Sequence, residues 1–214
     1  MYEFNFMGCM EIKELLGKKA NDAQKLMELI EEVPVDSIYY HTNSYFLRHW
    51  YIAGPYPNDF ANWAEIQLRD RVLSEKLAFV IPYQNANLED IRTGLIDIID
   101  RHLSELKTIP VVVSGEPFYF MKSQIIEVSA GLTANNLGEF TNALKTVDAS
   151  AIYNHIFEAR LRDKIGRSDF AIWFEEVLGL KELANKFEMV DSYMYSLEGL
   201  REKLLDLCYK EMRG

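Results

Sequence analysis

Two short blocks of sequence each occur twice in this chain, and they constrain its fold more than any other feature. When residues 4–48 are aligned without a gap to residues 118–162, 13 of 45 positions are identical. Unrelated sequences of average composition would match at roughly one position in sixteen. A match of this extent predicts a tandem duplication of one structural unit. The blocks are SIYYH (37–41) and DFANW (59–63), then AIYNH (151–155) and DFAIW (169–173).

The periodicity of apolar residues predicts about five helices in each copy, behind a short strand rich in aromatic and β-branched residues. We therefore predict a mainly α-helical protein with minor β structure, in which two homologous units are related by an approximate two-fold. Short strands are expected at 2–7, 109–113 and 118–128. Paired helices are expected at 21–33 and 136–147, at 36–51 and 150–165, after the caps Asn58 and Ser168, at 74–80 and 180–190, and at 87–106 and 196–212.

The length of 214 residues accommodates two units of ordinary domain size. We place the first unit at 1–106, a connector at 107–117 and the second unit at 118–214. With 23 basic and 33 acidic residues the net charge is −10, so we expect neither nucleic acid nor a membrane as partner.

The two cysteines, Cys9 and Cys208, are far apart, which favours free thiols in a reducing compartment. The N-terminal residues lack the pattern of a signal peptide, and no apolar run reaches membrane-spanning length. We expect a cytoplasmic protein.

Polar residues in the blocks form the first candidate site. The spacing of Ile38, His41, Tyr45 and Arg48 puts them on one stripe of a helix, and the matching stripe is Ile152, His155, Ala159 and Arg162. A catalytic interpretation would use histidine as acid or base, aspartate to orient it and arginine to hold an anion. Its residues would be His41, Asp59, Arg48, His155, Asp169 and Arg162, with Tyr39 and Tyr153 stacking on a ligand.

The other interpretation is structural: each histidine is buried and bonds the first turn of the next helix, because buried polar groups must be paired. We favour it, since no nucleophile accompanies the histidine in both copies. Phe60 and Trp63, like Phe170 and Trp173, have the spacing of a core stripe. The pairs Glu89/Arg92 and Glu198/Arg201 are interpreted as solvated or interface pairs.

The copies differ most in the connector after the histidine helix. The first copy has an aromatic, Pro- and Gly-containing loop at His49–Pro57, where the second has only Asp163–Arg167. The loop could cover a ligand or contact a partner, or it could pack its aromatics onto the protein itself. If one copy binds anything, we expect it to be the first, through His49, Trp50, Tyr51 and Tyr56.

The sequence contains no catalytic signature. GxGxxG, GxSxG and HExxH are absent, and Gly17-Lys18-Lys19 lacks the spacing of a phosphate loop. The histidines and cysteines have no ligand spacing of a metal site. We expect no metal and no cofactor.

The motifs FxFM, IYxH, DFAxW (NDFAxW in the first copy) and LExxR each occur twice. With them the chain resembles an uncharacterised family of bacterial and archaeal proteins known only as a domain of unknown function. The resemblance would cover nearly the full length. It implies no catalytic residues, and for the family only an association with carbohydrate-metabolising enzymes.

Two hypotheses follow. The favoured one is a non-enzymatic binding or scaffold protein for an unidentified protein or small molecule, with a homo-oligomer left open. The alternative is an enzyme or receptor for a sugar or phosphorylated ligand that uses the His/Asp/Arg/Tyr residues.

Overall fold

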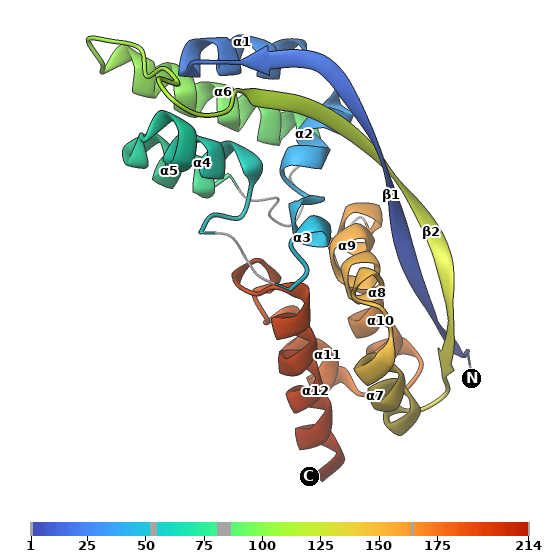
Figure 1. Cartoon of the computed structure of the whole chain (residues 1–214). Helices are drawn as coiled ribbons and strands as arrows, with labels where there is room; N and C mark the ends of the chain where they lie inside the picture. The colour runs from blue at the N-terminus through green and yellow to red at the C-terminus, as the bar shows by residue number, and fades with distance from the viewer. Residues whose placement is uncertain (1, 52–54, 81–86, 164, 214) are drawn as a thin grey trace. The chain divides into compact units, whose positions relative to one another are not determined.

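The structure, a computed structural model, describes residues 2–51, 55–80, 87–163 and 165–213. Its longest extended elements are two strands of 17 residues each, β1 (Phe4–Ala20) and β2 (Phe118–Ala134), which pair in one antiparallel sheet (Figure 1). Gly17 and Gly131 have φ near +70° in these strands, a conformation that costs glycine far less than other residues.

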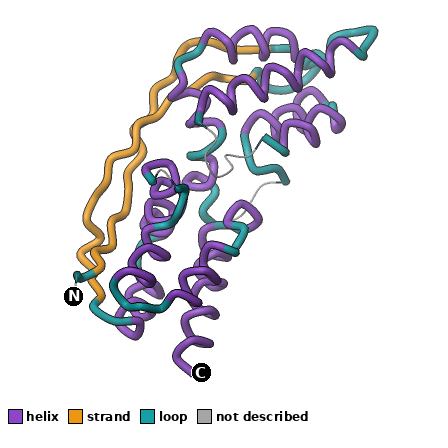
Figure 2. The backbone as a smooth tube through the Cα atoms, turned by 180° about the vertical axis from the view of Figure 1, so that it is seen from behind, coloured by secondary structure: helices purple, strands orange, loops and turns teal. Residues whose placement is uncertain are grey.

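The chain forms two compact units, and each combines segments from distant parts of the sequence. Unit 1 consists of Met1–Met10, Phe46–Ala53 and Ile125–Gly214, and unit 2 of Glu11–Tyr45 and Gly54–Gln124. Each long strand therefore belongs to one unit at its start and to the other at its end. Helices and strands are separated by colour in Figure 2.

Unit 1 surrounds the start of β1 with the helices that follow β2. Phe4 and Phe6 insert among Phe140, Phe170 and Trp173, with ring centroids 5.0–6.1 Å apart. Five aromatic rings in contact bury a large apolar area in this core, and such ring pairs stabilise it beyond their burial. Its helical segments are α7 (Leu137–Thr146), α8 (Ala149–Tyr153), η2 (Asn154–Glu158), α9 (Ala159–Arg162), α10 (Asp169–Glu176), α11 (Lys181–Glu188), η3 (Ser192–Met194) and α12 (Leu197–Arg213).

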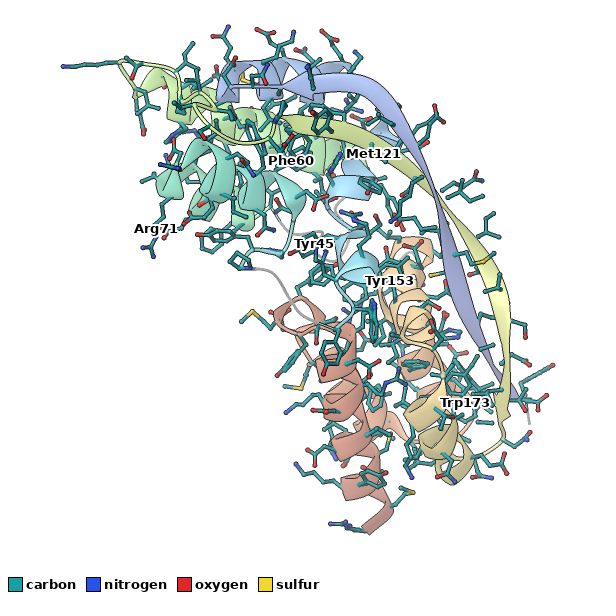
Figure 3. All side chains as sticks on the ribbon, in the orientation of Figure 1. Tyr45, Phe60, Arg71, Met121, Tyr153 and Trp173 are labelled. Atoms are coloured by element: carbon teal, nitrogen blue, oxygen red, sulfur yellow. The ribbon has the colours of Figure 1, made fainter. Side chains whose placement is uncertain are left out.

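Unit 2 surrounds the start of β2 with the helices that follow β1. Phe118 stacks on Phe60 at 5.0 Å and 15°, and Trp63 meets the same ring edge-on at 5.7 Å (Figure 3 labels Phe60). Phe120 is fully buried in this cluster. The helical segments are α1 (Ala23–Glu32), α2 (Val35–His41), α4 (Asp59–Trp63), η1 (Ala64–Leu68), α5 (Arg71–Ala78) and α6 (Leu88–Ser104), while α3 (Tyr45–Arg48) begins at the last residue of this unit's first segment.

The predicted fold class was wrong in its architecture, a duplicated five-helix unit with minor β structure, although helix does predominate. Strands take 18% of the described residues beside 57% helix, and the two strands are 17 residues long, so the β structure is not a short element in front of each set of helices. The structure also does not show two self-contained copies of a five-helix unit, since both compact units combine residues from the two halves of the sequence. The strand prediction stopped too early because the later residues of β1 are mostly exposed and mix charged side chains with exposed Ile12 and Leu15. The alternation of buried apolar and exposed polar residues on which the prediction relied is therefore missing there.

Two local predictions were also wrong. The helix expected at 36–51 breaks after His41. There the Thr42 hydroxyl donates to the Ile38 carbonyl and the Ser44 hydroxyl to the Tyr40 carbonyl, each four residues back. Such bonds compete with helical ones. The strand expected at Ile109–Val113 is a single bridge between Asp22 and Val111.

The capping predictions were confirmed. Asn58 accepts from the Ala61 N–H at 2.8 Å and begins α4, and Ser168 accepts from the Ala171 N–H at 3.3 Å and begins α10. Asn87 begins α6 with a reciprocal capping box with Asp90. Each cap satisfies a backbone donor that the helix leaves unpaired.

The two arginines of the LExxR blocks are largely buried, contrary to the solvated interpretation. Arg92 donates to the carbonyls of Ile30 and Val33 at the end of α1. Arg201 donates to the carbonyl of Leu144 near the end of α7. Each guanidinium thus satisfies carbonyls that a helix end leaves open.

Among the described residues, no helix combines the length and the apolar character needed to cross a membrane.

Candidate functional site

In unit 1, the His155 ring is held from both sides. Its side chain is 5% exposed, its Nδ1 lies 2.8 Å from Asp169 Oδ2, and the Met7 N–H donates to its Nε2 at 2.8 Å. The ring packs against Phe4 at 4.8 Å and Phe170 at 5.2 Å. The histidine therefore joins the η2 helix, the first turn of α10 and the start of β1.

These contacts define the tautomer. A backbone N–H can only donate, so Nε2 must be the unprotonated acceptor nitrogen. Nδ1 then carries the proton and donates it to the Asp169 carboxylate. Both ring nitrogens are in use, and neither faces solvent.

In unit 2, His41 makes the same contacts with different elements. Its Nδ1 lies 2.8 Å from Asp59 Oδ2, and the Met121 N–H donates to Nε2 at 3.1 Å; Figure 3 labels Met121 on β2. The side chain is 4% exposed and the ring packs on Phe118 at 4.6 Å. The neutral Nδ1–H tautomer follows here too.

The tryptophans of the same blocks also bond to the chain segment that precedes each strand. Trp63 Nε1 donates to the Glu116 carbonyl and Trp173 Nε1 to the Tyr2 carbonyl, both at 3.0 Å. In unit 1, Trp173 thus binds the backbone before Phe4 and His155 the backbone after Phe6. In unit 2, Trp63 and His41 do the same before Phe118 and after Phe120. The tryptophans were predicted to lie in the core, but no sequence signal indicates the carbonyls they bind, which lie 53 and 171 residues away.

The predicted arginines differ between the units. Arg162 donates to Asp169 Oδ2 at 3.1 Å, to Glu127 Oε1 at 2.7 Å and to Asn154 Oδ1 at 3.1 Å. The predicted trio of His155, Asp169 and Arg162 is thus brought together. Arg48 belongs to unit 1, whereas His41 and Asp59 belong to unit 2.

The two tyrosines expected to stack on a ligand are buried. Tyr153 is fully buried and its ring stacks on Phe157 at 5.4 Å, and Tyr39 is 8% exposed. Neither ring presents a face to solvent in the structure.

The aromatic loop is only partly described, since residues 52–54 of His49–Pro57 lie outside the described residues. Trp50 and Tyr51 are exposed and belong to unit 1, and their rings meet at 5.6 Å. His49 is half-buried. Tyr56 belongs to unit 2, where it packs partly buried against the core cluster.

Trp50 lines a pocket of about 330 Å³ in unit 1. Its backbone is fixed there, because the Trp50 carbonyl accepts from the Glu198 N–H at 3.1 Å at the start of α12. Asp148 and Arg201 also line this pocket, but they are distant in the chain from Trp50 and no sequence pattern links them to it. The lining residues are Leu47, Trp50, Thr146, Val147, Asp148, Ala149, Ser150, Glu198 and Arg201.

Over residues 1–209 the chain matches the model of a family described as "Family of unknown function (DUF5752)". The chain belongs to this family. Membership of an uncharacterised family was expected and is confirmed, while the taxonomic range of that expectation stays a prediction. No curated protein matches the chain significantly.

Among solved structures, this DUF5752 chain is similar to one titled "The structure of OrfY from Thermoproteus tenax". The TM-score is 0.79 at 22% sequence identity, and the alignment covers 100% of this chain and 97% of the other. At this identity the likeness shows a shared fold alone.

Among the described residues of the DUF5752 chain, no group of three or more His, Cys, Asp or Glu side chains is arranged to hold a metal ion.

Proposed function

We propose that this DUF5752 protein is a non-enzymatic binding protein whose two His–Asp pairs fix its strands to its helices. The observation that carries the proposal is the use of both ring nitrogens in His41 and in His155. A general base needs a free nitrogen within reach of a substrate proton. Here the nitrogen that would serve accepts a backbone N–H and is buried.

The binding surface we propose is the pocket beside Trp50. Of the aromatic residues in the loop at His49–Pro57, Trp50 is the one that lines a described pocket. Its volume of about 330 Å³ is at the lower end of the range for small-ligand sites. It fits a small molecule or a single side chain of a partner protein.

A thermal-shift panel on the parent protein and Trp50→Ala tests this function. The panel contains small cationic, neutral and anionic compounds, with Phe79→Ala as matched control because Phe79 is 76% exposed and lies in the other unit. A ligand at one hundred times its Kd adds about 2.7 kcal/mol, which for a chain of this size raises Tm by roughly 5–10 °C.

We expect at least one class of compound to raise the Tm of the parent and of Phe79→Ala but not of Trp50→Ala. If no class does so, the pocket is not a binding site and the proposed function is wrong.

A further inference from the structure

Trp50 is exposed, whereas the other two tryptophans are buried in the cores of their units. Trp63 and Trp173 are 7% and 6% exposed and donate their indole N–H to a carbonyl. Trp50 is 49% exposed, and its indole N–H has no acceptor within the described part of the chain. Although this ring meets the Tyr51 ring edge-on, a half-exposed indole at the wall of a pocket can contact a ligand with its remaining surface and its N–H.

Charged side chains also line this pocket, and Arg201, the one cationic residue among those that line it, is already paired with Glu198. Arg201 is 8% exposed; its Nε and Nη2 donate to the two oxygens of Glu198 at 2.7 and 3.0 Å, and its Nη1 to the Leu144 carbonyl. This two-pronged pairing fixes the guanidinium. Three of its five N–H donors are used in these bonds and its charge is paired with Glu198, whereas each Glu198 oxygen retains a lone pair for a further donor.

Asp148 adds a second carboxylate. Its Oδ1 accepts from the Ser150 N–H at 2.9 Å. Hydrogen bonding from the Ser150 side chain and backbone, helped by the charge of Arg201, holds the pKa of Asp148 below its ordinary value. The pocket therefore contains two negative charges and one positive charge, together with an aromatic surface.

From this geometry we propose that the Trp50 pocket binds a cationic ammonium group, in contact with the indole ring and the carboxylates of Asp148 and Glu198. This inference rests on the proposed binding function and names the chemistry of its ligand. A cation beside an aromatic face is attracted by the ring quadrupole, most strongly by tryptophan. The net charge of −10 adds long-range attraction for a cation.

The ammonium group can come from a free alkylamine or from a lysine side chain of a partner protein. The primary probes are n-butylammonium, n-butanol and butanoate, which share a carbon chain and differ in charge. Titrations followed by backbone NMR shifts at constant ionic strength measure Kd for each. A second pair, a blocked Ala-Lys-Ala peptide and its norleucine analogue, separates the two sources.

Three variants give the test its controls. Trp50→Ala removes the ring, and Asp148→Asn removes one charge while keeping a good helix cap. Asp36→Asn, in exposed sequence of unit 2, changes the net charge equally at a distance from the pocket.

We expect n-butylammonium to bind the parent and Asp36→Asn, and Trp50→Ala to bind it about tenfold more weakly, within the range for a cation–aromatic contact. Asp148→Asn should weaken it by about threefold, as for loss of one partly solvated charge. Tighter binding of the lysine peptide than of butylammonium identifies a protein partner, and the reverse identifies a free amine.

Equal or tighter binding of butanol or butanoate overturns the ammonium assignment and leaves the proposed binding function standing. Binding of no probe in any charge class removes both.

Discussion

Replacing His155 with alanine tests whether the buried histidines serve folding. The change leaves the Met7 N–H without its acceptor, and an unsatisfied buried donor costs about 1–3 kcal/mol. It also empties space between Phe4 and Phe170. Truncating a buried aromatic ring costs about 3–5 kcal/mol, and the imidazole is smaller and more polar than those rings.

Asp169 is not stranded by the change, because Arg162 still donates to its Oδ2 at 3.1 Å. We therefore expect a total loss of about 3 kcal/mol in the free energy of unfolding, mostly from the donor and the cavity. For a chain of this length that lowers Tm by roughly 6–12 °C. His41→Ala should lose a similar amount, since the Met121 N–H depends on it in the same way.

The matched variant is His155→Gln. A glutamine amide offers one donor group and one acceptor oxygen, the polarity that the Nδ1–H tautomer presents to Asp169 and Met7. We expect it to recover at least half of the stability that alanine loses.

Urea unfolding followed by far-UV circular dichroism measures these differences, with the m-value checked for constancy. An alanine variant within about 0.5 kcal/mol of the parent, the range of ordinary surface substitutions, would refute the folding role. A glutamine variant no better than alanine would show that packing, and not the two hydrogen bonds, holds the strand.

Three further predictions follow from burial. Cys9 and Cys208 are both buried, and burial raises the pKa of the Cys208 thiol to about 12, so a thiol-specific colour reagent at pH 8 should label neither in the native protein and both in denaturant. Burial also raises the pKa of Tyr193 to about 12. The stability that this shift contributes is complete below the unfolded pKa of about 10 and is lost as pH rises toward 12. Tyr193→Phe should therefore flatten the decline of the free energy of unfolding between these pH values, and an unchanged slope would contradict this. Residues 118–214 expressed alone lack Phe4 and Phe6 and should show no cooperative urea transition, whereas a sharp transition would mean that the aromatic core of unit 1 forms without them.

Local signals predicted local structure in this chain. Asn58, Asn87 and Ser168 begin helices because a short polar side chain satisfies a backbone donor three residues on, and that chemistry is visible in sequence. Burial of Phe60 and Trp63 could be predicted for a similar reason, since the apolar stripe of a helix needs a core to cover it. The break after His41 was missed because helical periodicity continues through it, while the competing hydroxyl bonds depend on side-chain conformation.

Which helices pack against each strand could not be predicted from the sequence. The pattern FxF at Phe4 and Phe6 indicates a strand with one buried face, and nothing in its period identifies the helices that bury it. The sequence match favoured self-contained halves, because a short strand beside its own helices is the simplest arrangement. The structure instead places Phe4 against Phe140 and Trp173, more than 130 residues away.

The candidate site, too, could be predicted only in part. His41 with Asp59 and His155 with Asp169 could be paired from sequence, since both members occur within matching blocks. The third member of each contact, the Met121 or Met7 N–H, is a backbone group and leaves no mark in the residue type. It is also the member that matters most for function, since it decides the tautomer and occupies the nitrogen that catalysis would need.

The structural use of these residues has a consequence for where binding can occur. A buried histidine bonded on both sides can be withdrawn for chemistry only by breaking a strand-to-helix contact, which costs about as much as the alanine variant would lose. Trp50 makes no contact of this kind: its carbonyl accepts from the Glu198 N–H, its side chain is 49% exposed, and its ring meets the exposed ring of Tyr51. An exposed aromatic side chain on a backbone held by a hydrogen bond suits recognition of a ligand at low entropic cost. We therefore propose that the matching His–Asp pairs serve the fold and that Trp50, which has no counterpart in the second block, serves recognition.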